Sequence, residues 1–285
     1  MLFPIGFSIP ESKLVDKVPE KKLYLATYRP GDTYPYSTEK EYYAGYQEAI
    51  FGFTCKKAGW DCLRHYEILA NGCIPWFPSL RQCPPNTMTL FPKGKVLEAM
   101  KTLKTMDSSG VHPFSQELLD YTRTHLTTRA MAKYMLEASN HADAKRILFL
   151  SGNLWTDYLR CLTLHGCKEL LGAACHDFPR IPHLYKDFPD EKLSELYGKG
   201  MSHSQLLETT ERDDRLDTTI VDDIISHKYD IVIYGSLHRG LPFFDVVTKH
   251  YEPKDILILC GEDLHEECAA EQLSTAGFMI FKREL

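Results

Sequence analysis

The sequence predicts an α/β protein built from two doubly wound, Rossmann-like units that face a cleft. Short apolar strands alternate with helical segments in residues 22–104 and again in residues 146–282. A mostly helical stretch at residues 114–138 separates the two series, and polar loops follow several of the strands. This alternation is typical of parallel sheets covered by helices, in which ligands sit beyond the carboxyl ends of the strands.

The first unit contains three predicted strands, each followed by a helix. The strands are predicted from their apolar side chains at residues 22–29, 49–55 and 73–77. The helices are predicted at residues 37–48, 61–71 and 93–104. Ser37 or Thr38 is expected to cap the first helix and Asp61 the second, which Gly72 ends.

The second unit contains four predicted strands, at residues 146–150, 230–234, 255–260 and 278–282. Helices are predicted at residues 154–165, 218–226, 241–250 and 264–277. The stretch at residues 178–199 is rich in proline, aromatic and charged residues, which predicts a mobile loop with one short helix. The expected domains are residues 1–110 and 143–285, joined by a helical connector at residues 111–142.

Composition and charge limit the class of protein. The chain is 44% hydrophobic and 25% charged, which is typical of a globular protein. A net charge of -6 lacks the basic surface of a nucleic-acid-binding protein, so no nucleic-acid partner is expected. No apolar stretch approaches the ~18 residues of a membrane span, and residues 1–6 have no basic signal-peptide region. We therefore expect a soluble, cytoplasmic protein without a membrane anchor.

The nine cysteines are expected to be reduced core residues, because their number is odd and no C-x-x-C pair occurs. Cys62, His65 and Cys73 do not have the spacing of a zinc site, and no Asp-x-Asp motif is present. No metal and no bound cofactor are expected. The absence of G-x-G-x-x-G, Walker, G-x-S-x-G and H-E-x-x-H motifs weakens dehydrogenase, kinase, hydrolase and metalloprotease interpretations.

The most informative pattern lies between the second and third strands. A loop containing Lys57 and Gly59 leads into a helix whose backbone N–H groups and dipole form an anion site. Arg64, in its first turn, could add a bidentate phosphate contact. Glu67, three residues later on the same face, could accept hydrogen bonds from ribose hydroxyls. Alternatively, Arg64 and Glu67 form a plain surface salt bridge worth less than ~1 kcal/mol, and Trp60 is a core aromatic residue.

The run from residue 59 to residue 75, GWDCLRHYEILANGCIP, resembles the donor-site signature of exostosin-like (family 47-like) glycosyltransferases. In that family an Arg, a Glu and a Gly-Cys-Ile-Pro sequence occur at this spacing. The region around residues 83–88 resembles the xylosyltransferase type from viruses of algae, including chloroviruses. The resemblance covers roughly residues 20–95, between a quarter and a third of the chain.

The resemblance implies a GT-B-like glycosyltransferase that moves a sugar from a UDP-sugar to a hydroxyl of a glycan or glycoprotein, without a metal and with inversion. Xylose is the sugar that the viral type suggests, and a viral enzyme would act in the host cytoplasm. Arg64 would hold the donor diphosphate and Glu67 the ribose. Exostosin-like enzymes place the donor domain second, so the signature in the first half implies either a permuted domain order or another role for the second unit.

The predicted donor-binding residues are Lys57, Gly59, Trp60, Asp61, Arg64 and Glu67, with Arg239 as a second phosphate candidate. An inverting transfer needs a base near the acceptor hydroxyl. Asp157, His238 and Asp263 are the candidates, because each follows a predicted strand of the second unit. In the simpler interpretation, Asp157 complements a helix dipole, Asp263 caps a helix and His238 is an ordinary loop residue.

Two rival functions remain open at this stage. One is another nucleotide-dependent transferase or hydrolase whose site uses the loop at residues 235–240. The other is a non-catalytic carbohydrate-binding protein with the same fold. The first rival would depend on Arg239 rather than Arg64, and the second would bind sugar without nucleotide affinity.

Overall fold

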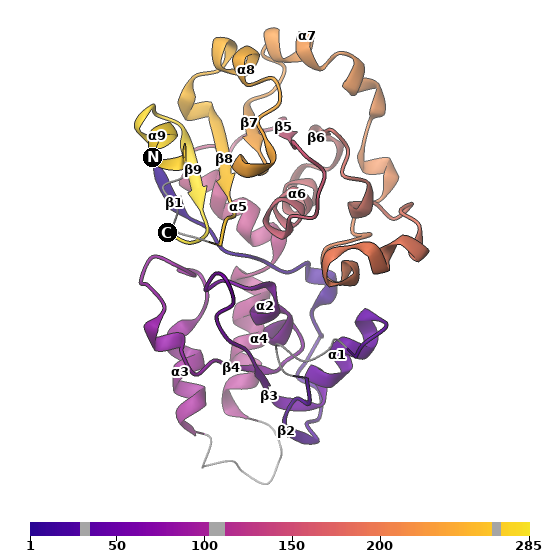
Figure 1. Cartoon of the computed structure of the whole chain (residues 1–285), viewed down its shortest axis with the longest axis vertical. Coiled ribbons are helices and arrows are strands. Elements are labelled where there is room, and N and C mark those ends of the chain that lie inside the picture. The colour runs from indigo at the N-terminus through magenta and orange to yellow at the C-terminus, as the bar shows by residue number, and fades with distance from the viewer. Residues whose placement is uncertain (29–34, 103–111, 264–268) are drawn as a thin grey trace.

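The computed structural model describes residues 1–28, 35–102, 112–263 and 269–285, which form two β-sheets and their covering helices (Figure 1). The strands of the larger sheet are β1 (Leu2–Pro4), β5 (Ile147–Leu150), β6 (Cys175–Phe178), β7 (Ile231–Tyr234), β8 (Ile256–Cys260) and β9 (Met279–Lys282). Those of the smaller sheet are β2 (Leu23–Leu25), β3 (Ala49–Phe53) and β4 (Ile74–Trp76). The described helices are α1 (Glu39–Gln47), α2 (Leu63–Ala70), α3 (Lys93–Lys101), α4 (Pro113–His125), α5 (Thr128–Ala138), α6 (Tyr158–Leu171), α7 (Ile220–Ile225), α8 (Phe244–His250) and α9 (Ala269–Thr275).

The described strands pair in parallel in both sheets, which confirms the predicted α/β class. The larger sheet has the order β1-β9-β8-β7-β5-β6 and the smaller one the order β2-β3-β4. In the larger sheet β6 lies on one side of β5, and β7, the next strand along the chain, lies on the other side of β5. A reversal of this kind creates a crevice at the carboxyl ends of the two central strands, here β5 and β7.

The larger sheet is buried on both faces, as its continuous apolar strands require. Ile147 and Phe149 of β5 belong to one hydrophobic cluster together with residues of α5 and α6. Leu148 and Leu150, which point the other way, belong to a second cluster with residues of α7, α8 and α9. Strands β7 and β8 alternate between the same two clusters, so the unit is doubly wound and compatible with a Rossmann-like fold.

The smaller sheet is covered in part by α1 and α2. Thr38, one of the two residues predicted to cap this helix, caps α1 through a reciprocal capping box with Glu41. The predicted cap of the second helix is wrong, because α2 begins at Leu63 after an N-cap at Cys62 that makes no side-chain hydrogen bond. The side chain of Asp61 instead accepts a hydrogen bond from the backbone N–H of Phe7, at 2.7 Å.

The chain divides between the two sheets differently from the predicted domain bounds. Strand β1 pairs with β9 of the larger sheet, although it lies at the start of the chain. The predicted single connector consists of two helices that meet at Leu126 and Thr127. The first, α4, packs on α2 and α3 of the smaller unit, while the second, α5, packs on α6 of the larger unit. The expected break at residues 107–110 lies outside the described residues.

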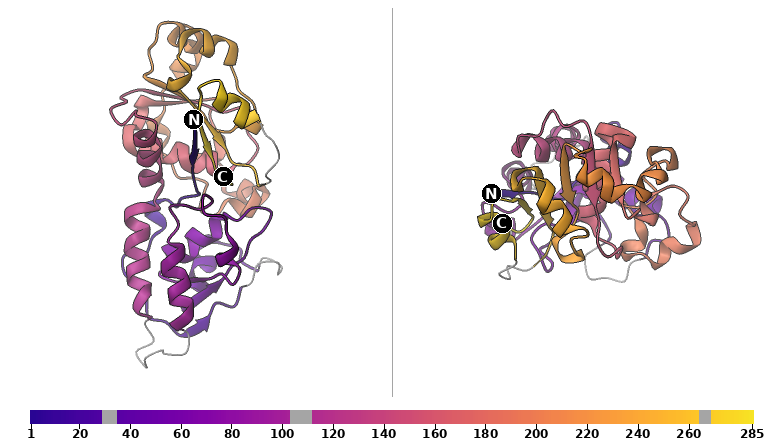
Figure 2. Two further views of the ribbon diagram at one scale, coloured as in Figure 1. Left: turned by 90° about the vertical axis from the view of Figure 1, so that its left-hand side faces the viewer. Right: turned by 90° about the horizontal axis from the view of Figure 1, so that it is seen from above.

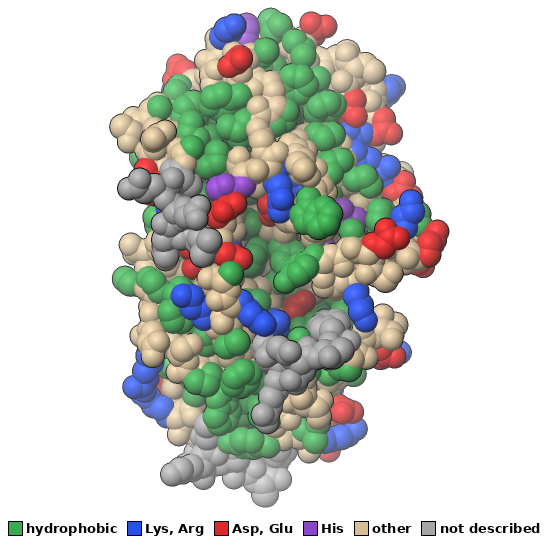
Figure 3. Space-filling view, in the orientation of Figure 1, with side chains coloured by type: hydrophobic (Ala, Val, Ile, Leu, Met, Phe, Trp, Pro, Cys, Tyr) green, Lys and Arg blue, Asp and Glu red, His purple; other side chains and the backbone are tan. Residues whose placement is uncertain are grey.

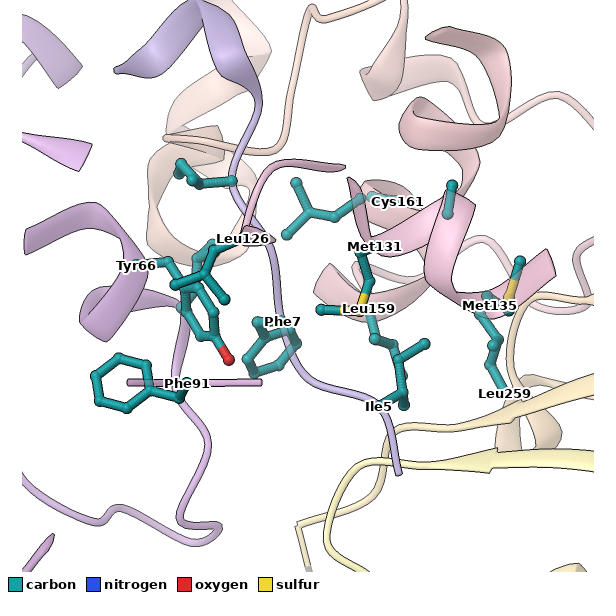
Figure 4. Packing of buried hydrophobic residues seen from close by; sticks show 14 of the residues in the cluster. Ile5, Phe7, Tyr66, Phe91, Leu126, Met131, Met135, Leu159, Cys161 and Leu259 are labelled. Atoms are coloured by element: carbon teal, nitrogen blue, oxygen red, sulfur yellow. The ribbon is translucent and has the colours of Figure 1, made fainter. Parts of the chain in front are cut away.

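The two units share one hydrophobic core. The segment from Ile5 to Ile9 passes between them and contributes Ile5, Phe7 and Ile9 to a cluster with residues of both units. Figure 4 shows Phe7 near Tyr66 of α2 and, on the side of the larger sheet, Ile5 near Met131 and Leu159. Figure 2 shows the two units stacked along the long axis, with both chain ends drawn on the larger one. No helix in the described part of the chain is long and apolar enough to cross a membrane.

Two helical glycines provide a test of how tightly the helices pack. A Cβ atom at Gly166, in α6, would lie 2.1 Å from the carbonyl oxygen of Thr128 in α5, whereas a Cβ at Gly94 in α3 would meet nothing within 4 Å. Gly166→Ala should therefore lower the free energy of unfolding by roughly 1–3 kcal/mol, because α5 and α6 must separate. Gly94→Ala, the matched control, should raise it by roughly 0.5–1 kcal/mol. Urea unfolding of both variants measures the difference, and equal effects would contradict the close helix contact.

Candidate functional site

The loops after the strands of both sheets open onto one cleft. The larger sheet contributes residues that follow β1, β5, β7, β8 and β9, and the smaller sheet contributes residues that follow β2 and β3. Figure 3 shows a hollow between the two units, with acidic, basic and histidine side chains around it. The cleft therefore lies at the carboxyl ends of the strands, where open α/β sheets bind ligands.

The cleft consists of two adjoining compartments. The Arg64 compartment, about 680 Å³, is bounded by α2 and by the loop at residues 57–59. The switch-point compartment, about 640 Å³, lies at the carboxyl ends of β5, β7 and β8. Both volumes are typical of small-molecule sites. The residues that line both compartments are Phe7, Ala58, Tyr158, Tyr197 and Asp263.

Arg64 is a partly buried cation in the wall of its compartment. Its Nη1 lies 3.9 Å from the Cys62 sulfur, and its guanidinium carbon lies 5.9 Å from the centre of the Tyr28 ring. Its Nε atom is buried without a hydrogen-bond partner among the described residues. Because Arg64 lines the compartment, the guanidinium N–H groups that face it could donate to an oxygen-rich anion bound there.

Glu67 lines the same compartment but is only 6% exposed. Its Oε2 accepts a hydrogen bond from the Tyr42 hydroxyl at 2.7 Å, and its Oε1 accepts one from the Ser202 hydroxyl. Burial raises the pKa of Glu67, and these two hydrogen bonds oppose that shift. The alternative of a surface salt bridge with Arg64 is therefore wrong. A carboxylate has about four acceptor positions, so a ribose hydroxyl can still bind there.

The loop at residues 59–61 is not the open anion site that the sequence predicts. The backbone N–H groups of Trp60 and Asp61 donate to the Glu284 carboxylate at 3.1 and 2.9 Å. A Cβ atom at Gly59 would lie 2.5 Å from Glu284 Oε1, so the glycine makes room for that carboxylate. The Glu284 carboxylate thus occupies the position where a phosphate is predicted to bind. Lys57 and Arg64 are the predicted donor-binding cations that line this compartment.

Trp60 lies outside both compartments, in contrast to its predicted role in donor binding. Its ring packs against Phe77, with ring centres 6.2 Å apart, and the Lys56 ammonium lies 5.1 Å from it. The core-aromatic alternative describes Trp60 better.

Arg283 and Glu284, directly after β9, join the two units, and we call their contacts the Arg283 latch. The Arg283 guanidinium is 1% exposed and donates to the carbonyl oxygens of Asp61, at 2.7 Å, and of Gly261, at 3.0 Å. It also pairs with Glu284, at 2.9 Å, and with Asp263. Buried charges require partners of this kind. The latch therefore holds Asp61, beside α2, against the loop that follows β8.

Asp157 and Arg239 meet in the switch-point compartment. Asp157 caps α6 by accepting a hydrogen bond from the Arg160 N–H, at 3.1 Å. Its second carboxylate oxygen lies 3.8 Å from Arg239 Nε, and Arg239 also donates to the Thr156 carbonyl oxygen at 3.4 Å. Each side chain thus has a structural role in the described fold, and for Asp157, the N-cap of α6, this role is close to the alternative in which it complements the helix dipole.

His238 lies in the same compartment with both ring nitrogens near protein groups. Its Nδ1 is 3.1 Å from Glu262 Oε1, and its Nε2 is 3.5 Å from the Cys260 sulfur. Burial lowers the pKa of His238, although Glu262 opposes the shift. Both ring nitrogens of His238 thus already have protein partners, although the residue lines the compartment.

Asp263 is the predicted catalytic candidate that lines both compartments. Its side chain is 52% exposed, and Oδ1 pairs with Arg283. Asp263 therefore lies at the boundary, where it could contact ligands bound in either compartment. The predicted helix after it begins at Ala269 in the described chain, and residues 264–268 lie outside the description.

The sequence analysis missed the segment at residues 197–203, which it placed in or beside a mobile loop. In the structure Tyr197, Gly198 and Met201 line the Arg64 compartment, and Ser202 contacts Glu67. The Ser202 N–H also donates to Glu39 at 2.6 Å. Ser202 and Glu67 are 135 residues apart, so no local sequence signal could have paired them. Arg283, Glu284 and Trp155 were missed for the same reason.

Metal ligation has no support in the described residues, where no group of three His, Cys, Asp or Glu side chains is arranged to hold an ion. His65 instead hydrogen-bonds Thr54 Oγ1 at 2.9 Å and the Trp60 carbonyl oxygen at 3.0 Å. Burial lowers the pKa of His65 to about 3. No disulfide joins any of the cysteines that the structure describes.

The buried carboxyl group of Asp61, beside the latch, should make the stability of the protein depend on pH. Burial raises the pKa of Asp61 from 3.8 to about 6, and Arg283 and the Phe7 N–H oppose the shift. The folded state therefore binds the carboxyl proton of Asp61 more tightly than the unfolded state does. Binding of this proton stabilises the fold fully below about pH 4, and the stabilisation is lost as the pH rises through about 6. Asp61→Asn resembles the protonated form, so it should be more stable than wild type at pH 7.5, by up to about 3 kcal/mol.

Urea unfolding at pH 4.5 and pH 7.5 measures this effect, and the advantage of Asp61→Asn should shrink at the lower pH. Asp245→Asn, an exposed carboxylate on α8, is the control. A variant less stable than wild type at pH 7.5 would show that the attraction between Asp61 and Arg283 outweighs the cost of burial.

Comparison with known proteins provides no independent assignment of this cleft. No protein-family model, curated protein or solved structure matches the chain.

Proposed function

We propose that the protein is a nucleotide-sugar-dependent glycosyltransferase of GT-B-like architecture. The observation that carries the proposal is the shared cleft, in which a partly buried arginine lies in one compartment and an exposed carboxylate lies at the boundary with the other. The exostosin-like signature at residues 59–75 supports it, because Arg64 and Glu67 both line the Arg64 compartment.

In this proposal the diphosphate of a UDP-sugar lies beside Arg64, which lines the compartment and whose guanidinium can donate to phosphate oxygens. Lys57, at the same compartment, adds positive charge. As the bond between the sugar and the diphosphate breaks, its electron pair passes to the departing phosphate oxygen. A fixed cation stabilises that developing charge. Xylose remains our expectation for the sugar, from the resemblance alone.

Asp263 is the base in this proposal. Its carboxylate would take the proton of an acceptor hydroxyl, while that oxygen attacks the anomeric carbon and inverts its configuration. Asp263 suits this role better than His238 or Asp157, because it lies at the boundary and half of its side chain is exposed. Its ion pair with Arg283 fixes Oδ1 and orients Oδ2.

Donor binding is tested by thermal unfolding with a panel of nucleoside diphosphates and nucleotide sugars. A ligand at 100 times its dissociation constant stabilises the fold by about 2.7 kcal/mol. We expect a uridine nucleotide to raise the unfolding midpoint of wild type, and Arg64→Ala to abolish most of that increase. Arg81→Ala, an exposed arginine outside both compartments, should keep it.

The outcomes separate the rival functions. Binding that survives in Arg64→Ala but fails in Arg239→Ala would assign the nucleotide to the switch-point compartment and favour another nucleotide-dependent enzyme. If no nucleotide stabilises wild type, the glycosyltransferase proposal is wrong, and a non-catalytic carbohydrate-binding protein becomes the better hypothesis.

The catalytic role of Asp263 is tested by Asp263→Asn. Loss of a general base lowers kcat by roughly 10²–10⁴-fold. The nucleotide should still raise the unfolding midpoint, because Arg64 is unchanged. His238→Gln and Asp157→Asn, measured in the same donor-hydrolysis or transfer assay, should retain more activity than Asp263→Asn. If His238→Gln alone abolished turnover, the base would be His238.

A further inference from the structure

Two aromatic side chains are unusually exposed at the same compartment. Tyr197 is 71% exposed and Trp155 is 67% exposed, and both line the switch-point compartment. They are the two most exposed large apolar side chains in the described part of the chain. Exposed apolar groups that gather beside polar ones mark a binding surface.

The loop that carries Trp155 is held in one conformation. Arg160 is fully buried, and its guanidinium donates to the carbonyl oxygens of Asn153, at 2.6 Å, and of Trp155. The Asn153 side chain accepts from the Trp155 N–H at 2.7 Å. A Cβ atom at Gly152 would lie 1.8 Å from the Arg239 carbonyl oxygen, so this loop packs directly on the loop after β7. The exposed indole is therefore attached to a rigid backbone, which lowers the entropy lost on binding.

Tyr197 is supported from behind. Its ring lies 5.6 Å from the ring of Tyr158, and Tyr158 in turn packs edge-on against His203, with ring centres 4.6 Å apart. His203 is fully buried. Tyr158 lines both compartments, so this aromatic stack forms part of the shared wall.

The polar groups of the compartment favour a neutral ligand with hydroxyl groups. Arg239 pairs with Asp157, and Arg283 pairs with Asp263 and Glu284. The two arginines are thus already neutralised by carboxylates. Glu262 and Asp263, which are exposed, offer acceptors to hydroxyl donors.

We propose that Trp155 and Tyr197 are the aromatic walls of a carbohydrate subsite, which holds the acceptor sugar in the switch-point compartment. The apolar C–H face of a sugar ring packs on the indole, while its hydroxyl groups donate to Glu262 and Asp263. A sugar in this place would present a hydroxyl to Asp263 at the boundary between the compartments. This inference rests on the proposed function, since the bound sugar is the acceptor of that reaction.

The test uses saturation-transfer NMR and tryptophan fluorescence with a panel of neutral pentoses, hexoses and their short oligosaccharides. Trp155→Ala should weaken saccharide binding by about tenfold, and Trp155→Phe should weaken it less, because a smaller ring remains. Tyr197→Ala should also weaken binding. Tyr24→Ala, an aromatic residue that is 44% exposed on β2 and lines neither compartment, is the matched control.

Binding of UDP is measured in parallel by its effect on the unfolding midpoint. If UDP binds and Trp155→Ala leaves saccharide binding unchanged, the subsite is wrong while the proposed function stands. If no nucleotide binds but saccharides bind in a Trp155-dependent way, the subsite stands and the transferase proposal fails. If Trp155→Ala abolishes UDP binding, the indole stacks on a nucleobase and the carbohydrate assignment is overturned. It is also overturned if wild type binds no saccharide of the panel at about 10 mM, a weak-binding limit.

Discussion

The buried guanidinium of Arg283 determines how the two units of this protein meet. It contacts backbone oxygen atoms on both sides of the cleft, at Asp61 and Gly261, and pairs with the carboxylates of Glu284 and Asp263. Its central guanidinium carbon also lies 4.7 Å from the ring centre of Phe7, in the segment that passes between the units. A charge buried this deeply is tolerated only when its partners stay in place, because removal of one partner leaves the others uncompensated. The latch therefore keeps the cleft in a defined shape.

The same latch makes the two compartments of the cleft chemically different. Glu284 uses the N–H groups of Trp60 and Asp61, so the loop before α2 does not serve as a phosphate cradle. Arg64, which lines the compartment, is then the arginine nearest to a bound anion in our proposal, and Asp263 is oriented at the boundary by its pair with Arg283. In the proposed function an anion binds on one side and a neutral, hydroxyl-bearing ligand binds on the other. This asymmetry is what a transfer between a charged donor and a sugar acceptor would require.

The segment at residues 197–203 adds a third contact between the units. Lys199 and Ser202 adopt left-handed backbone conformations, with φ of 54° and 69°, which are uncommon for residues other than glycine. The surrounding contacts compensate for this conformation: Ser202 binds Glu39, Tyr43 and Glu67 of the smaller unit, and Lys199 donates to the Tyr36 carbonyl oxygen at 2.5 Å. Glu67 is therefore at once a lining residue and an anchor for this segment. The position of Tyr197 depends on the same contacts.

The sequence by itself determined the α/β class, seven of the nine strands that the structure describes and the placement of candidate residues at strand ends, but it did not predict β1 or β6. These features are local, since apolar runs, helix caps and glycine breaks act within a few residues. The tertiary structure decided which candidates meet. Glu284 reaches Trp60 across 224 residues, Ser202 reaches Glu67 across 135, and strand β1 joins β9 at the opposite end of the chain. Buried polar groups form hydrogen bonds with the groups that the tertiary fold places beside them. These partners are far apart in the sequence, so the spacing of neighbouring residues does not predict them.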